Sequence, residues 1–217
     1  MRTIAFVTQK GGSGKSTIAS SLAVAAHEAG ERVFVIDMDP QASLLRWFKI
    51  RRDKGIAVEA VTPGKLPAAL NALSKSGVTL VIIDTPGSDS AVAQAAMKAA
   101  DLCVIPSRPN VFDLWASELT RQQLRALKKE YVFLLNQCPP AQQSQRVHDG
   151  AKALEAMGGL LTPMIGARVD YQEAARHGWG VTELAPSSVA SEEVRKLWGS
   201  VKRRLKALKP ETKKKAA

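Results

Sequence analysis

Apolar and polar positions alternate along the chain in two different rhythms. Short, nearly continuous apolar runs at Thr3–Thr8, Arg32–Asp37 and Thr79–Asp84 are typical of strands that are buried on both faces of a sheet. A weaker run predicts a strand at Ile56–Val61. Further strands are predicted at Leu102–Ile105, Tyr131–Leu135 and Leu161–Ile165.

The segments between these runs repeat their apolar residues with a helical period. Gly30 and Gly77 follow two of them, as is common at the ends of helices. Ser191 is predicted to cap the last helix, with Glu192 and Glu193 in its first turn. The predicted helices are Ser16–Ala29, Ala42–Arg52, Leu66–Ser76, Ser90–Ala99, Val111–Lys129, Gln143–Met157, Asp170–Arg176 and a last one that runs to Leu208.

Strands that are joined by crossover helices predict a mostly parallel sheet with helices on both faces. We therefore expect a single α/β domain over residues 1–209 and a disordered basic tail at 210–217. No apolar run approaches the ~18 residues of a membrane span, and no secretory signal is recognisable. Cys103 and Cys138 lack a C-x-x-C spacing, so we expect two buried thiols and a cytoplasmic protein.

The loop after the first strand, "QKGGSGKST", ends like a phosphate-binding loop. Its glycines allow consecutive backbone N–H groups to point inward around phosphate oxygens, and the following helix adds its positive amino end. Lys15 is expected against the β- and γ-phosphates, Ser16 on Mg²⁺ and Thr17 on a more internal phosphate. The predicted nucleotide-binding residues of the loop are Gly11, Gly12, Ser13, Gly14, Lys15, Ser16 and Thr17.

Three aspartates follow the carboxyl ends of other predicted strands, where ligands of parallel sheets bind. Asp84 ends "TLVIID" and is the natural partner for Mg²⁺ through water, because Mg²⁺ keeps several waters and takes only one or two carboxylates. Asp37 and Asp39, in "VIDMDPQ", are candidates for Mg²⁺ and for the attacking water.

Four ordered motifs, "KGGSGKST", "DMDPQAS", "VIIDTPG" and "VIPSRPNVFD", resemble the ParA/MinD family of deviant Walker-A ATPases, and most of all its small ParA-type partition ATPases. The similarity of pattern runs from Met1 to about residue 195. It implies a P-loop NTPase fold, a slow Mg²⁺-dependent ATPase and a homodimer that forms when ATP is bound. A second protein that stimulates hydrolysis is implied as well.

The same resemblance assigns roles to individual residues. In similar proteins the early lysine, here Lys10, reaches across the dimer to the partner's phosphates, as an arginine finger does. Asp39 would orient the attacking water, while Asp37 and Asp84 would lie near Mg²⁺. Residues 106–113 would lie at the dimer face, and Asn136 is a candidate for contact with adenine.

The net charge of +11 is concentrated in two segments. Residues 46–54 hold five basic residues and one acidic residue, and residues 192–217 hold ten basic and three acidic ones. Localised charge of this kind favours a polyanion surface. The DNA-binding candidates are Lys202, Arg203, Arg204, Lys206 and Lys209, with Arg195, Lys196, Arg51 and Arg52 as secondary choices.

These observations lead to the hypothesis of an ATP-gated ATPase that binds nonspecific DNA, associates with the nucleoid, and partitions a plasmid, chromosome or protein assembly. Because the first strand begins at once, a helix-turn-helix reader of operator sequences is not expected. A MinD-like membrane-positioning ATPase is the alternative, since the last helix has an apolar stripe that would suit lipid or the protein core. The stripe consists of Val194, Leu197, Trp198, Val201, Leu205 and Leu208. A ligase of the dethiobiotin-synthetase type is a third possibility, although no second polar constellation marks a substrate pocket.

Overall fold

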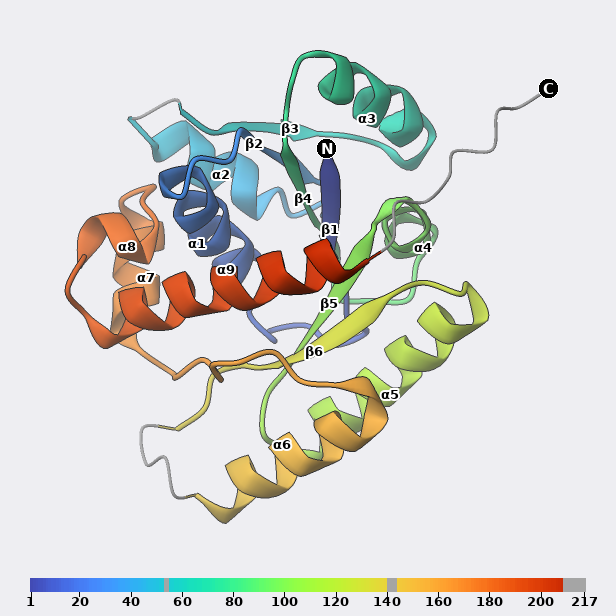
Figure 1. Ribbon diagram of the computed structural model, residues 1–217, viewed down its shortest axis with the longest axis vertical. Coiled ribbons are helices and arrows are strands. Elements are labelled where there is room, and N and C mark those ends of the chain that lie inside the picture. Colours follow the sequence, from blue (N-terminus) through green and yellow to red (C-terminus); the bar gives the residue numbers. More distant parts are fainter. Residues whose placement is uncertain (53–54, 140–143, 209–217) are drawn as a thin grey trace.

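The computed structural model describes residues 1–52, 55–139 and 144–208, and within them a single parallel sheet forms the centre of the molecule. The strands run in the order β3-β2-β4-β1-β5-β6 (Figure 1). Their bounds are Arg2–Phe6 for β1, Val33–Asp37 for β2, Ala57–Ala60 for β3, Leu80–Asp84 for β4, Leu102–Ser107 for β5 and Tyr131–Leu135 for β6. Lys209 and the predicted tail at 210–217 lie outside the described residues.

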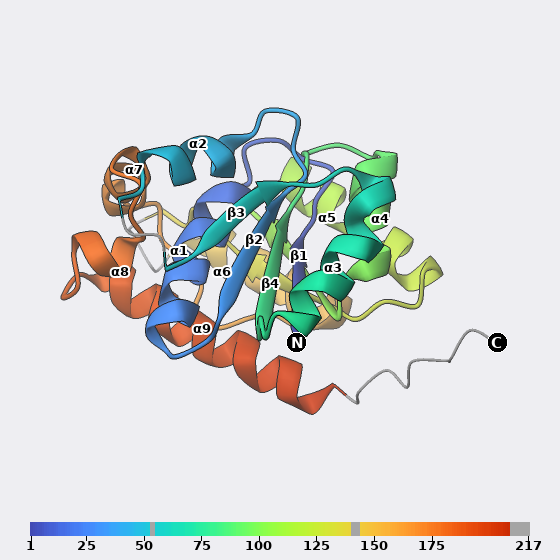
Figure 2. The same ribbon diagram turned by 90° about the horizontal axis from the view of Figure 1, so that it is seen from above.

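Helices cover both faces of the sheet (Figures 1 and 2), which confirms the predicted α/β class. Successive side chains of a strand point to opposite faces, so Ile4 and Phe6 belong to one core and Ala5 to the other. The first core is covered by α1 (Lys15–Glu28), α2 (Ser43–Ile50), α7 (Val169–Arg176), α8 (Val181–Leu184) and α9 (Val189–Ala207). The second is covered by α3 (Leu66–Lys75, after a short 3-10 turn at Pro63–Lys65), α4 (Ala91–Ala99), α5 (Val111–Ala126) and α6 (Gln145–Gly158).

The strand order brings three chemically important loops to one edge. Because β4 lies between β2 and β1, the carboxyl ends of all three meet. Asp84 is in register with Asp37 on one side and with Phe6 on the other. The sheet register alone therefore makes the phosphate loop and the predicted aspartates neighbours.

The predicted strand at Leu161–Ile165 is wrong. This segment runs beside β6 and bonds to it, with Leu161 N–H donating to the Phe133 carbonyl and Ile165 N–H to the Leu135 carbonyl, but only isolated bridges form there. Pro163 lacks an N–H and cannot continue a regular ladder. Conversely, β5 extends through Pro106 to Ser107.

The beginning of the last helix also differs from the prediction. The helix starts at Val189 and is capped by Ser188, whose Oγ accepts from the backbone N–H of Ser191 at 3.2 Å. Ser191 is one turn further on and fully buried, and its hydroxyl donates to the Val181 carbonyl at 2.8 Å. The short helix α8, which provides that carbonyl, was not predicted, because four residues are too few for a helical period of apolar positions to be recognised.

The apolar stripe of α9 packs inside the protein. Val194, Leu197, Val201 and Leu205 are all buried, and α9 lies against α1. The stripe is therefore part of the first core and is not a surface for lipid. Among the described residues, no helix has the length and hydropathy needed to cross a membrane. The free thiols Cys103 and Cys138 are both buried, as predicted.

Candidate active site at the carboxyl edge of the sheet

The phosphate loop depends on glycine at two backbone positions. Gly12 and Gly14 have φ values of +75° and +85°, a region that favours glycine. A Cβ on Gly14 would lie 2.4 Å from Nδ2 of Asn136, so a side chain there would also collide with the residue that follows β6. Gly14 directly precedes α1, and the loop thus leads its backbone N–H groups to the positive end of a helix.

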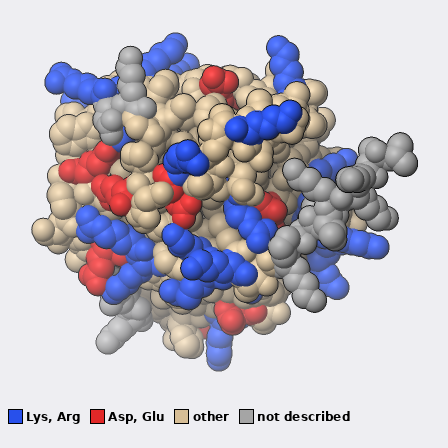
Figure 3. Space-filling view, turned by 45° about the horizontal axis from the view of Figure 1, so that its top comes forward, with Lys and Arg blue, Asp and Glu red and all other residues tan. Residues whose placement is uncertain are grey.

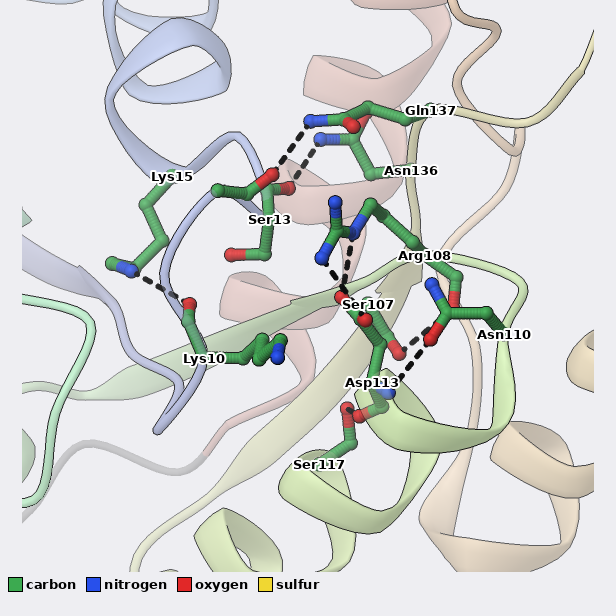
Figure 4. Close-up of polar contacts among 11 residues, drawn as sticks. Lys10, Ser13, Lys15, Ser107, Arg108, Asn110, Asp113, Ser117, Asn136 and Gln137 are labelled. Atoms are coloured by element: carbon green, nitrogen blue, oxygen red, sulfur yellow. Dashed lines mark hydrogen bonds and ion pairs between the residues drawn. The ribbon is translucent and has the colours of Figure 1, made fainter.

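Two amides that follow β6 hold the outside of this loop (Figure 4). Nδ2 of Asn136 donates to the Ser13 carbonyl at 2.8 Å, and Nε2 of Gln137 donates to the Gly12 carbonyl at 3.0 Å. These bonds draw the carbonyl oxygens outward, away from the space where phosphate would lie. Asn136 was predicted to contact adenine, and that contact stays a prediction, whereas its role as a brace was not anticipated from "NQCPP".

Lys15 and Ser16 begin α1 and point toward the acids. Lys15 is only 6% exposed, and its Nζ lies 3.4 Å from the Lys10 carbonyl. Burial lowers the pKa of Lys15, while the charges of Asp84 and Asp39 act to raise it. The Ser16 hydroxyl donates to Oδ2 of Asp84 at 2.5 Å. A phosphate anion would give the buried ammonium a charged partner in addition to the Lys10 carbonyl.

Asp84 is fully buried, and its second oxygen has no hydrogen-bond partner among the described residues. Burial raises the pKa of Asp84 to about 7, with the nearby carboxylates of Asp37 and Asp39 adding to the rise and Ser16 and Lys15 opposing it. A buried, partnerless carboxylate oxygen beside a hydroxyl suits a hard cation with oxygen ligands. These residues fit Mg²⁺ that arrives with a nucleotide.

Asp37 and Asp39 have different surroundings. Asp37 is buried, and its oxygens accept from the backbone N–H groups of Asp39, Leu44 and Leu45 at 2.9 to 3.1 Å. Burial raises the pKa of Asp37, and these backbone bonds act against the rise. Asp37 therefore anchors the start of α2, a role that the sequence did not indicate. Asp39 is half-exposed and accepts from Gln41 N–H at 2.9 Å.

Two adjoining cavities border the loop. One of about 370 Å³ is lined by Lys15, Ser16 and Asp39, together with the loop glycines. The other, of about 260 Å³, is lined by Gly14 and Asn136, with Arg168 and Tyr171 among its other residues. Thr17 contributes to both. The first has the polar groups for a polyphosphate, and the second has the place and size for a base joined to it.

Lys10 lies on the outer side of the loop. Figure 4 shows its side chain directed away from Lys15, toward the amino end of α5. There Arg108, which the sequence did not single out as a site residue, forms a forked ion pair with Asp113 at 2.8 and 3.1 Å. Nη1 of Arg108 lies 4.0 Å from the position of a Cβ on Gly12. The two cations face the same side of the phosphate loop.

The predicted DNA-binding side chains of α9 lie on its exposed side. Lys202 pairs with Glu31 at 2.9 Å and lies over the ring of Trp198, while Arg204 is 4.0 Å from Glu130. Arg203 and Lys206 are exposed. Figure 3 shows basic side chains gathered mainly in the lower half of one face, with acidic ones among them.

The secondary DNA candidates separate into different environments. Arg51 is 4% exposed, pairs with Glu183 at 2.6 Å and stacks on Trp47, so the expectation that it contacts DNA is wrong. Its neighbour Arg52 is exposed. Arg195 donates to the Pro186 carbonyl at 2.7 Å, and Lys196 pairs with Glu192 at 2.5 Å.

Comparison with known proteins gives a consistent result. The family profile of the CobQ/CobB/MinD/ParA nucleotide binding domain matches residues 4–181. Maintenance of carboxysome distribution protein A of Halothiobacillus neapolitanus is 28% identical over 92% of this chain and 95% of its own length. Chromosome-partitioning ATPase Soj of Thermus thermophilus is 28% identical over 91% of this chain and 94% of its own. The fold is similar to that of septum site-determining protein MinD complexed with Mg-ADP from Pyrococcus horikoshii, with a TM-score of 0.74, 19% identity and coverage of 94% and 96%.

Proposed function

The chain belongs to the CobQ/CobB/MinD/ParA nucleotide-binding family, and from that premise we propose that it is a positioning ATPase whose ATP-bound dimer binds DNA without regard to sequence. It is a P-loop ATPase that uses ATP and Mg²⁺. The observation that carries the proposal is the pair of lysines on one loop. Lys15 is buried and lines the phosphate cavity, whereas the half-buried Lys10 points away from Lys15, toward the amino end of α5.

Within one subunit the phosphate loop binds and orients the triphosphate. The inward N–H groups and Lys15 neutralise phosphate charge, and Ser16 with Asp84 would hold Mg²⁺ through the hydroxyl and through water. When bound with the nucleotide, Mg²⁺ would supply positive charge that offsets the charge of the phosphates. The half-exposed Asp39 lines the same cavity, where it would orient the attacking water.

Lys10 would act on the partner's nucleotide. A cation supplied in this way stabilises the charge that develops on the transferred phosphoryl group, and such fingers contribute roughly 10³ to 10⁵ in rate. Because Lys10 points away from the phosphates of its own loop, hydrolysis in an isolated subunit should be slow. Dimerisation would then control the rate of hydrolysis.

DNA binding would follow from the same dimer. If each subunit provides about three phosphate contacts through the exposed bases of α9, two subunits provide about six, and affinity would fall with salt with a log–log slope of about −5. Lys206 is the most available contact, since Lys202 is engaged by Glu31 and Arg203 donates to the Ser200 hydroxyl. An ATP-loaded dimer of this kind would associate with the nucleoid.

The cargo and the stimulating adaptor are proposed by analogy with relatives. One relative is named for carboxysome distribution and another for chromosome partitioning, so relatives of this chain are named for different cargoes. We propose a partner protein that stimulates hydrolysis and links the ATPase to a plasmid, chromosome or protein assembly. The membrane alternative loses its main support, because the α9 stripe is buried.

The decisive experiment compares wild type with Lys10→Ala, using Lys65→Ala, an exposed lysine before α3, as a matched control. Sedimentation with Mg²⁺ and ATP measures dimerisation, a filter assay measures DNA binding and phosphate release measures turnover. Lys10→Ala should bind nucleotide through Lys15 yet hydrolyse it at least tenfold more slowly, and the control should match wild type. Equal turnover in all three proteins would remove the role of Lys10, and lipid binding without DNA binding would favour the membrane alternative.

A further inference from the structure

One acidic side chain of α9 holds the wall of the cavity that has the place and size for the base. Residues 166–168 line both this cavity, of about 260 Å³, and a larger cavity of about 570 Å³ on their other side. We call these three residues the shared wall. Of the two cavities, Glu193 lines the larger one. It therefore contacts the shared wall from the side opposite to the base.

The carboxylate of Glu193 has three partners in and beside the shared wall. Its Oε2 accepts from the backbone N–H of Gly166 at 3.3 Å. Its two oxygens accept from the guanidinium of Arg168, at 2.6 Å from Nη2 and 3.2 Å from Nε. The hydroxyl of Tyr171, in the first turn of α7, lies 3.3 Å from Oε2. One carboxylate of α9 thus ties together the backbone of the wall, its cation and the start of α7 (Figure 1).

The shared wall is closely fitted around these contacts. A Cβ on Gly166 would lie 3.0 Å from Nε of Arg168, so the glycine leaves room for the guanidinium to fold back over its own segment. On the other side, the N–H of Ala167 donates to the Cys138 carbonyl at 2.7 Å. The wall is therefore held by the chain that follows β6 and by Glu193 of α9.

The contacts of Glu193 are largely shielded from solvent. Its side chain is 12% exposed, and Tyr171 is buried. Burial and the charge of Glu193 raise the pKa of Tyr171, so the hydroxyl keeps its proton and can donate it to the carboxylate. Hydrogen bonds to an ionised group are stronger than neutral ones and fix the geometry of both partners. The neighbouring Glu192 differs, because its side chain is 62% exposed and pairs with Lys196 of the same helix.

We propose that Glu193 is a positioning residue of the nucleotide site, which holds the shared wall and Tyr171 in the shape that receives the base. It acts through Gly166, Arg168 and Tyr171 and does not contact the phosphate loop. The inference rests on the proposed function only in that an adenine nucleotide is the ligand, and it is independent of the dimer and of DNA. Because phosphate would bind in the other cavity, the loss of Glu193 should weaken contacts with the base and leave those with phosphate unchanged.

A simpler role for Glu193 would be to stabilise the protein alone. Acidic residues in the first turn stabilise a helix, but in α9 that position belongs to Glu192. An ion pair that only joins α9 to the wall would lower the urea midpoint when it is removed. It would leave the ratio between the affinities for a nucleotide and for its bare phosphates unchanged. This ratio therefore separates positioning from stability.

The test compares the affinities for ADP and for inorganic pyrophosphate, both with Mg²⁺, by isothermal titration calorimetry. ADP carries the base, whereas pyrophosphate has only the phosphate contacts, and neither ligand involves hydrolysis or the ATP-bound dimer. The variant is Glu193→Gln, which removes the charge and keeps the size of the side chain. Glu192→Gln is the matched control, because it makes the same change one residue away, on the exposed side of α9. All titrations are made well below the urea midpoint of each protein.

Glu193→Gln should bind ADP about tenfold more weakly, the equivalent of one lost charge-assisted hydrogen bond, and pyrophosphate within about twofold of wild type. Glu193→Asp keeps the charge on a shorter side chain and should show the same selectivity with a smaller loss, which covers the case that Glu193→Gln does not fold. The double variant Glu193→Gln/Arg168→Gln should lose less ADP affinity than the sum of the two single losses, since Glu193 acts partly through Arg168. Glu192→Gln should match wild type.

Equal losses of ADP and pyrophosphate affinity in Glu193→Gln, or no loss of either, would overturn this inference. A loss of the same size in Glu192→Gln would overturn it as well, because the effect would then be one of charge near the amino end of α9. None of these results involves Lys10 or DNA, so the proposed function would stand. Conversely, a failure of dimerisation or of DNA binding would leave the selective loss of ADP affinity as expected here.

Discussion

Helices α5 and α9 are both amphipathic, yet they turn opposite sides to solvent. Helix α9 buries Val194, Leu197 and Val201 and exposes its basic residues. Helix α5 buries Asp113 and exposes Trp115. The apolar side of α9 closes the core, while the polar side of α5 is bonded to the phosphate loop. An apolar stripe in a sequence therefore does not reveal whether it faces the core or a partner.

A matched pair of leucines gives the largest expected contrast between these helices. Leu197→Ala in α9 should lower the free energy of unfolding by about 2–5 kcal/mol, because it leaves a cavity at a side chain that is 1% exposed. Leu119→Ala in α5 should change it by less than about 0.5 kcal/mol, since that side chain is 51% exposed in the monomer. Urea unfolding of both variants without nucleotide checks this, and similar losses would erase the distinction.

Asp84, the buried acid beside the phosphate loop, should give the next largest change in stability. The pKa of Asp84 is raised by burial to about 7, so the folded protein keeps a proton that the unfolded chain releases near pH 4. Without Mg²⁺ and nucleotide, this group should therefore cost stability as pH rises from 4 through 7, by up to about 4 kcal/mol. Asp84→Asn should lack that loss and be the more stable protein at pH 8. Parallel stability–pH curves for the two proteins would contradict the assignment.

The attachment of α5 to the phosphate loop can be tested without changing the exposed apolar side chains of this helix. Thr120→Val keeps the shape but leaves the N–H of Gln9 without its acceptor, which should cost about 1–3 kcal/mol of unfolding free energy. If this bond positions Lys10, ATP turnover should fall while the affinity for nucleotide stays constant. Thr120→Ser, which keeps an acceptor oxygen, should restore turnover. Equal turnover in Thr120→Val and wild type would show that the bond between α5 and the loop does not affect ATP hydrolysis.

The surface ion pair beneath α9 should have the smallest effect. Burial raises the pKa of Glu31, but hydrogen bonds from Lys202 and Thr79 outweigh it and the pKa is lowered. The stabilisation is therefore present at neutral pH and is lost as pH falls below the ordinary value of about 4.5. Glu31→Gln should cost only about 0.2–1 kcal/mol at pH 7, and less in high salt. A larger loss, measured by urea unfolding, would show that this pair is not an ordinary surface contact.

The sequence was sufficient where one local rule determined the structure. Apolar runs predicted β1 to β6, although the run at Leu161–Ile165 forms no strand, and glycine spacing predicted the phosphate loop with Gly12 and Gly14 at positive φ. It was insufficient where distant parts of the chain compete. Arg51 reads as a surface cation but is buried because Glu183, far along the chain, pairs with it. Ser191 reads as a cap but is buried, because the helix begins earlier at Val189.

The candidate site shows the same division. The positions of Lys15, Ser16 and Asp84 were predictable, since Asp84 ends β4 while Lys15 and Ser16 begin the helix that follows β1. The braces from Asn136 and Gln137 were not, because they depend on how β6 lies beside the loop in three dimensions. The outward side of α5 was equally hidden. The helical period of its apolar residues does not tell which side of the helix packs on the core and which side is exposed.

The amides of Asn136 and Gln137 have a consequence for how nucleotide exchange would work. They hold the carbonyl groups of Ser13 and Gly12, so the loop has less conformational freedom to lose when it binds phosphate. A loop that is held in this way is not expected to recognise the γ-phosphate by closing on it. We therefore expect residues outside this loop to distinguish ATP from ADP.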